Sequence, residues 1–228
     1  MTLDELLALK PLFHDNGLTG TVDTFQAGRR ILEFLDTHVK PGDSTLEIGA
    51  GVSTVLFALK GADHIAITPA LAELRRIHAF LQEHGIPRLK LQFISDTSER
   101  ALPRLEGEFD LALIDGAHGF PAPFLDWHYC ARLLKVGGLL VIDDTQLWTG
   151  HVLKGFLLAQ PGWELVRDYI PRHVVVRKSE PYDGVLNEIY QPYVIAETRR
   201  IQRRRRLRLA AGRMIPAPVA KVARRLLS

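Results

Sequence analysis

Two kinds of hydrophobic spacing divide the chain. In residues 1–40 apolar side chains recur at helical spacing in two stripes, one within residues 3–7 and one within residues 31–35. A polar, glycine-containing stretch at residues 14–20 separates the stripes and is typical of a loop. We therefore expect an N-terminal helical segment, part of which, residues 12–26, serves as a lid.

After Pro41 the spacing changes to short apolar runs that alternate with amphipathic stretches of helical length. Buried strands are expected at residues 44–48, 65–67, 89–94, 111–114 and 139–142. This alternation predicts a parallel α/β sheet with helices on both faces. Two further strands, 163–167 and 173–178, are joined by too few residues for a parallel crossover, so they must form an antiparallel pair.

The sequence thus predicts a seven-stranded, mostly parallel sheet whose last strand is antiparallel. Three segments follow from it: an N-terminal cap or lid at 1–40, the sheet domain at 41–180 and a C-terminal helical extension at 181–228.

Charge is distributed unevenly between the body and the end of the chain. Residues 195–228 hold 11 Lys and Arg against one acid, whereas residues 1–194 carry 18 Lys and Arg against 25 Asp and Glu, a net charge of −7. The basic pI belongs to the tail, so it does not indicate a basic catalytic surface. A lone cysteine, Cys130, excludes an intramolecular disulfide, and the lack of a leader or long apolar run favours the cytoplasm.

A glycine turn lies where the first strand of the sheet meets its first helix. Glycines 49 and 51 remove Cβ atoms there, so a ligand can approach the backbone and the helix N-terminus. Thr54 stands where the dinucleotide fingerprint requires its third glycine, and the acid Glu47 precedes the first, which argues against NAD.

The spacing Glu47-x-Gly49-x-Gly51-x-Ser53 resembles the first motif of class I methyltransferases that use S-adenosylmethionine (SAM). A Rossmann-like sheet of seven strands with a reversed last strand is also that family's sheet. The resemblance implies that this loop wraps the methionine and ribose of the cofactor, with Glu47 helping to hold its amino group.

Two strand ends differ in how well they fit this family. Where the family commonly places a ribose-binding acid, this chain has Thr68, which offers a single hydroxyl. After the next strand, Asp96 is implied to contact the adenine, although Asp96 or Thr97 is equally suited to cap the following helix.

A set of acids and one histidine follows the fourth and fifth strands. Asp115 and His118 follow the fourth, and Asp143 and Asp144 the fifth; carboxyl ends of parallel strands share one edge of a sheet. Without a nearby Lys or Arg, three carboxylates would raise one another's pKa, so we expect Asp115, Asp143 and Asp144 to bind Mg²⁺, Mn²⁺ or Ca²⁺. The alternative is that Asp143 or Asp144 only caps the next segment.

His118 is the candidate general base. The alternative is that its imidazole only forms hydrogen bonds with the backbone of its own loop. The pattern Asp-Gly-x-His followed by Asp-Asp resembles metal-dependent small-molecule and sugar O-methyltransferases of the macrocin and cephalosporin-pathway type, over roughly residues 40–178. The implied reaction is methyl transfer from SAM to a small-molecule or sugar hydroxyl, assisted by Mg²⁺.

The arginine-rich tail is the part that this resemblance does not cover. We expect a solvated, partly helical extension that packs on the body or on a second subunit; a basic amphipathic helix near residues 219–226 also suits a membrane surface. Nucleic acid is less favoured because no aromatic side chain interleaves the arginines after Tyr193. Two rival functions remain: an RNA or protein methyltransferase anchored by this tail, and a non-catalytic scaffold.

Overall fold

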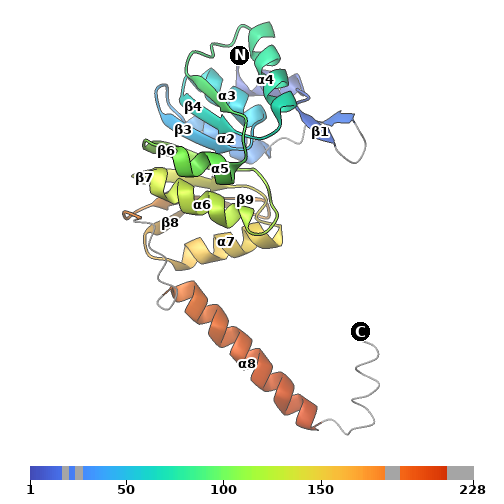
Figure 1. Ribbon diagram of the computed structural model, residues 1–228, viewed down its shortest axis with the longest axis vertical. Helices are drawn as coiled ribbons and strands as arrows, with labels where there is room; N and C mark the ends of the chain where they lie inside the picture. The colour runs from blue at the N-terminus through green and yellow to red at the C-terminus, as the bar shows by residue number, and fades with distance from the viewer. Residues whose placement is uncertain (17–20, 24–27, 183–190, 215–228) are drawn as a thin grey trace. The chain divides into compact units, whose positions relative to one another are not determined.

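The computed structural model describes residues 1–16, 21–23, 28–182 and 191–214 of the chain (Figure 1). Contacts divide the chain into two compact units, Met1–Val185 and Leu186–Ser228. The first unit contains the sheet, and the second contains one long helix, α8 (Pro192–Met214). The helix expected near residues 219–226 lies outside the described residues. Among the described residues, every helix is too short or too polar to cross a bilayer.

A seven-stranded sheet with the order β5-β4-β3-β6-β7-β9-β8 forms the centre of the first unit. Its strands are β3 (Ser44–Ile48), β4 (Asp63–Ile67), β5 (Leu91–Ile94), β6 (Phe109–Ile114), β7 (Leu134–Ile142), β8 (Trp163–Tyr169) and β9 (His173–Lys178). Strands β3 to β7 are parallel, and β9 runs antiparallel to both β7 and β8. The predicted fold class is confirmed.

Helices cover both faces of this sheet (Figure 1). Successive strand residues point to opposite faces, so Leu111 and Leu113 pack into one core and Ala112 and Ile114 into the other. The helices of the first core are α1 (Leu3–Ala8), α2 (Arg29–His38), α3 (Val52–Lys60) and α4 (Leu71–Glu83). Those of the second are α5 (Ser98–Ala101), the 3₁₀ helix η1 (Leu102–Arg104), α6 (Ala122–Leu133) and α7 (Trp148–Ala159).

The N-terminal segment differs from its prediction between α1 and α2. Instead of a continuous loop, β1 (His14–Asn16) pairs antiparallel with β2 (Thr21–Asp23). The polar, glycine-containing composition that predicted a loop also suits a short two-stranded ribbon, so local pattern did not separate the two. Residues 17–20 and 24–27, which complete the expected lid, lie outside the described part of the chain.

The strand order reverses at β3, which has β4 on one side and β6 on the other. After β3 the chain builds outward through β4 to β5, then crosses back to form β6. The loops that leave β3 and β6 therefore diverge, and ligands in open α/β sheets bind in the crevice that such a switch leaves beyond the strands' carboxyl ends.

Candidate active site

A cavity of about 700 Å³ opens at this edge of the sheet. Its walls come from the loops that follow β3, β4, β5, β6 and β7, joined by one residue from β1 and one from the β8–β9 turn. A volume of this size lies within the range of small-molecule and cofactor sites, about 300–1,000 Å³.

The glycine turn after β3 forms one wall. Gly49 has φ +108°, and a Cβ built on it would lie 2.3 Å from the backbone oxygen of Asp115. The loop is fixed on both sides, because Gly49 N donates to Ile67 O at 2.8 Å and Asp115 N donates to Ile48 O at 2.8 Å. Only glycine fits this bend, and it turns the N-terminus of α3 toward the cavity.

Glu47 has a supporting position instead of the ligand contact that we expected. Its side chain is 1% exposed and lies behind the cavity wall. The carboxylate accepts hydrogen bonds from Ser53 Oγ and, at 2.6 Å, from Thr54 Oγ1, and His64 Nε2 lies 3.2 Å away. Glu47 therefore ties β3 to the first turn of α3, and Ser53, although it lines the cavity, donates its hydroxyl to this network.

Of the two predicted residues that follow β4 and β5, one lines the cavity and the other does not. Thr68 lines the cavity, as predicted from its place after β4. Asp96 does not: it pairs with Arg104 at 3.0 Å and accepts from Thr97 N at 2.8 Å. Thr97, with Ser98 and Glu99, lines the cavity in its place.

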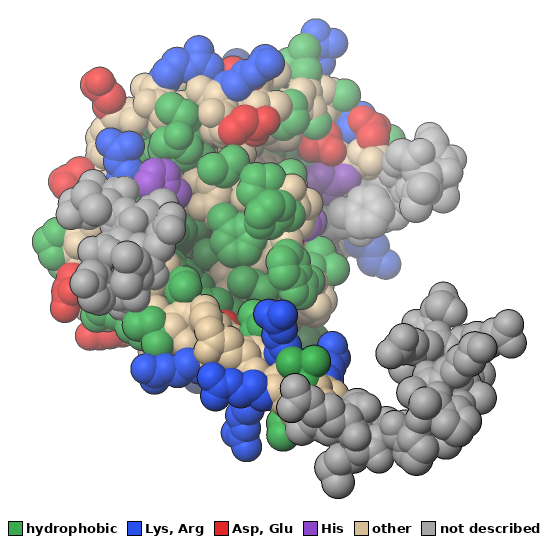
Figure 2. All heavy atoms as spheres, turned by 60° about the horizontal axis from the view of Figure 1, so that its bottom comes forward, with side chains coloured by type: hydrophobic (Ala, Val, Ile, Leu, Met, Phe, Trp, Pro, Cys, Tyr) green, Lys and Arg blue, Asp and Glu red, His purple; other side chains and the backbone are tan. Residues whose placement is uncertain are grey.

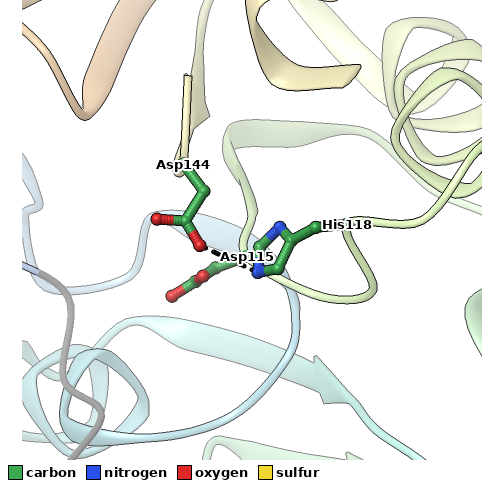
Figure 3. A group of neighbouring side chains, drawn as sticks. All are labelled: Asp115, His118 and Asp144. Carbon is green, nitrogen blue, oxygen red and sulfur yellow. Dashed lines mark ion pairs between the residues drawn. The ribbon is translucent and has the colours of Figure 1, made fainter. Parts of the chain in front are cut away.

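Asp115, His118 and Asp144 converge (Figure 3), and all three line the same cavity as the glycine turn. His118 Nε2 lies 2.9 Å from Asp144 Oδ2, and one ligand atom from each of the three side chains lies within 4.8 Å of the others. The hydrogen bond to Asp144 raises the pKa of His118, and the same bond lowers the pKa of Asp144. Burial, followed by the charges of Asp143 and Glu47, raises the pKa of Asp115 well above its ordinary value.

Asp144 occupies a backbone conformation that is rare for a residue with a side chain, with φ +52°. Its carbonyl accepts from Leu147 N at 2.9 Å, and a Cβ on Gly150 would lie 2.6 Å from that carbonyl oxygen. Such a conformation costs conformational free energy, so it persists only where the surrounding structure holds it. Conformations of this kind cluster at functional sites. Here the conformation accompanies a carboxylate aimed at His118.

The metal set of Asp115, Asp143 and Asp144 remains a prediction, but the carboxylate of Asp143 is paired with other side chains. Asp143 is buried and accepts from Arg172 Nε at 2.9 Å, with His173 Nε2 at 3.0 Å. Burial alone would raise its pKa, but the hydrogen bonds from His173 and Arg172 outweigh burial and lower the pKa to about 2. His118 takes the third place in the cluster.

The expectation that no Lys or Arg lies near these acids is wrong. Arg172, in the β8–β9 turn, forms ion pairs with Asp143 and Asp144. Strand β9 runs antiparallel beside β7, with Ile142 opposite Val174, so the start of β9 returns to the carboxyl end of β7. The antiparallel hairpin predicted from the sequence was therefore enough to place the β8–β9 turn, and Arg172 within it, at that edge of the sheet.

His14 and Glu73 are two further wall residues that are not among the predicted site residues. His14 Nδ1 lies 3.2 Å from Glu73 Oε1, which joins β1 to the first turn of α4. The His14 ring also covers the glycine turn, because a Cβ on Gly51 would lie 3.0 Å from its Nε2. These contacts join segments far apart in sequence, and no local pattern signals them.

Comparison with known families gives one match: residues 46–145 fit the model of a methyltransferase domain. The matched segment contains the glycine turn, Asp115, His118 and Asp144. Comparison with curated proteins gives no match.

Solved structures share the fold at low sequence identity. An rRNA methylase from Streptococcus thermophilus is 17% identical with a TM-score of 0.54, covering 68% of this chain and 99% of its own. A proposed methyltransferase from Streptococcus mutans in complex with SAH is 15% identical with a TM-score of 0.52, covering 67% and 99%. A proposed caffeoyl-CoA O-methyltransferase from Staphylococcus aureus is 18% identical with a TM-score of 0.55, covering 67% and 85%.

The match to a methyltransferase domain covers 100 of the 228 residues, and the similar structures share the fold with this chain. The substrate differs among the similar structures, so it does not follow from the fold.

Proposed function

We propose that this chain, whose residues 46–145 form a methyltransferase domain, transfers a methyl group from SAM to the hydroxyl of a small molecule or sugar. One observation carries the proposal: a single cavity contains both the glycine turn after β3 and the Asp115–His118–Asp144 cluster. A donor bound at the turn and an acceptor bound at the cluster would meet within one cavity.

The donor end suits SAM by shape and by hydrogen-bonding capacity. Gly49 and Gly51 line the cavity, and so do Val52 and Ser53 in the first turn of α3, where a helix leaves backbone N–H groups without an intrahelical partner and suits a carboxylate. Thr68 and the residues after β5 continue the wall, so they would contact the ribose and the adenine. When bound, SAM supplies an electrophilic methyl group on a sulfonium.

The acceptor end supplies a base held in place. As the acceptor oxygen bonds to the methyl carbon and the carbon–sulfur bond breaks, His118 would take the hydroxyl proton. Asp144 orients the imidazole and stabilises its charged form, which is consistent with the raised pKa of His118. Holding nucleophile, carbon and sulfur in line supplies a further large part of the rate enhancement.

The same three side chains also fit a divalent cation. Two carboxylates and one imidazole with ligand atoms within 4.8 Å of one another suit Mg²⁺ or Mn²⁺. A bound cation would polarise the acceptor oxygen and lower its pKa. His118 would then be a ligand, and the acceptor would lose its proton to solvent.

Turnover of SAM to SAH with a panel of catechol, sugar and glycolipid hydroxyls tests the proposal. Chelation should abolish activity, and Mg²⁺ or Mn²⁺ should restore it, if the cluster holds a cation. Activity that survives chelation but is lost in His118→Asn indicates that His118 acts as the general base without a cation. A chain that binds SAM yet methylates none of these hydroxyls would refute the proposed acceptor class.

A further inference from the structure

Helix α8 concentrates positive charge more than any other described segment of the chain. Within residues 192–209, whose side chains the structure describes, seven arginines face a single acid, Glu197. Figure 2 shows basic side chains projecting from both flanks of this helix. The arginines are Arg199, Arg200, Arg203, Arg204, Arg205, Arg206 and Arg208.

Most of this charge is uncompensated within the described residues. Arg200 pairs with Glu197 at 3.2 Å, and the other six arginines form no ion pair in the described part of the chain. Several lie four residues apart, as Arg199 and Arg203 do, and like charges at that spacing destabilise a helix. An anionic partner would relieve this repulsion.

The arginines surround the helix instead of forming one face. At about 100° per residue, they leave no sector wider than about 100° without a guanidinium. Of the exposed apolar residues, Val194, Ile201 and Leu209 share a sector of about 80° with Arg205, and Leu207 points elsewhere, so they form no continuous apolar face. A helix that lies on a bilayer needs a continuous apolar face, so a membrane surface does not suit α8.

A duplex nucleic acid presents charge in the arrangement that α8 requires. The major groove of B-form DNA is about 12 Å wide, so a helix about 10–12 Å wide fits between its two phosphate backbones with negative charge on both flanks. Every basic side chain in the described part of α8 is arginine, whose planar fork binds phosphate oxygens in pairs. Single strands would instead require aromatic stacking platforms, which residues 199–209 lack.

We propose that α8 binds the phosphate backbones of double-stranded DNA from within its major groove. The net charge of −7 on residues 1–194 opposes any approach of nucleic acid to the rest of the chain, so binding depends on α8. Such binding is independent of the proposed methyl transfer and does not require that nucleic acid is the acceptor.

Fluorescence anisotropy of the full chain with a labelled duplex, as DNA and as RNA, over rising salt tests this proposal. Each phosphate contact adds about −0.9 to the slope of log K against log salt, so seven arginines give a slope near −6. With all four arginines at 203–206 replaced by Gln, the slope should fall to about −3 and affinity at about 100 mM salt should drop roughly 10³-fold.

Matched variants show whether a loss of duplex affinity comes from the charge of α8, from the position of its arginines or from unfolding of the helix. Replacement of the same four residues by Lys keeps the charge and should keep most of the slope. A control set replaces four exposed arginines of the first unit by Gln and should bind duplex as the parent does: Arg30, Arg75, Arg88 and Arg132. Circular dichroism of each variant checks that the helical content is unchanged.

Four results would overturn the proposal. One is absence of duplex binding at low salt, and a second is an equal loss of affinity in the control set. A third is binding to a single strand as tight as to the duplex. The fourth is an α8-dependent partner of another kind, either anionic vesicles or a second copy of the chain seen by sedimentation, that duplex does not displace.

Discussion

Replacement of Asp143 by Asn removes the charge that Arg172 and His173 share, and its cost follows from the structure. The ordinary pKa of 3.8 falls to about 2 in the folded chain, and each pKa unit corresponds to about 1.4 kcal/mol, so the ionised carboxylate contributes about 2–3 kcal/mol. We expect Asp143→Asn to lower the free energy of unfolding by about this amount at neutral pH.

The sign of the pH dependence follows from a folded-state pKa that lies below the unfolded one. The contribution is complete above about pH 4 and disappears as pH falls toward 2, with roughly half left at pH 3. Urea titrations followed by circular dichroism, run at several values between about pH 7 and pH 3, measure the difference between parent and variant. The difference should shrink on acidification.

A matched control uses an exposed pair. Asp63 lies 3.0 Å from Lys90 with both side chains more than half exposed, and Asp63→Asn should cost less than about 1 kcal/mol at any pH. A loss for Asp143→Asn that is equally large at pH 3 and pH 7 would refute the electrostatic explanation and indicate lost packing instead. A loss no greater than that of the control would refute it as well.

Further expectations concern the cavity and the tail. His118→Ala should lower kcat/KM by about 10²–10⁴-fold. Asp144→Asn should move the inflection of the pH–rate profile to lower pH, because the bond that raises the pKa of His118 is weakened, and an unmoved inflection would contradict the pairing. Gly49→Ala should cost about 1–3 kcal/mol in urea unfolding, since φ +108° and the Asp115 oxygen exclude a Cβ, and a neutral substitution would disprove that close approach. Deletion of residues 197–228 should leave turnover of a small hydroxyl acceptor unchanged, whereas its collapse would favour an acceptor held by the tail. Calorimetry should detect SAM binding to the full chain; its absence at millimolar cofactor would favour the non-catalytic scaffold.

The sheet was predictable because each strand is a short apolar run bounded by turn residues. The reversed last strand followed from one local fact, the few residues that separate Tyr169 from His173. Placement of Gly49, Asp115 and Asp144 at one cavity followed from the rule that carboxyl ends of parallel strands share an edge.

Side-chain partners were harder to predict because they depend on packing between distant segments. Glu47 and Asp96 stand at the expected positions but face Thr54 and Arg104 instead of the cavity. A strand-end position fixes where a residue lies, whereas neighbouring donors decide where its carboxylate points. The exchange of Asp143 for His118 in the cluster has the same cause, since Arg172 had no local signal near either acid.

The short turn between β8 and β9 also limits how the chain can vary in length. One extra residue there adds about 3.3 Å of backbone, more than the 2.9 Å that separates Arg172 Nε from Asp143 Oδ1. Insertions that a surface loop would ordinarily accept should therefore move the guanidinium of Arg172 away from Asp143. The buried carboxylate would then lose its ion pair with Arg172. Loop exchange among similar folds should succeed around the cavity rim more readily than at this turn, where Arg172 pairs with both Asp143 and Asp144.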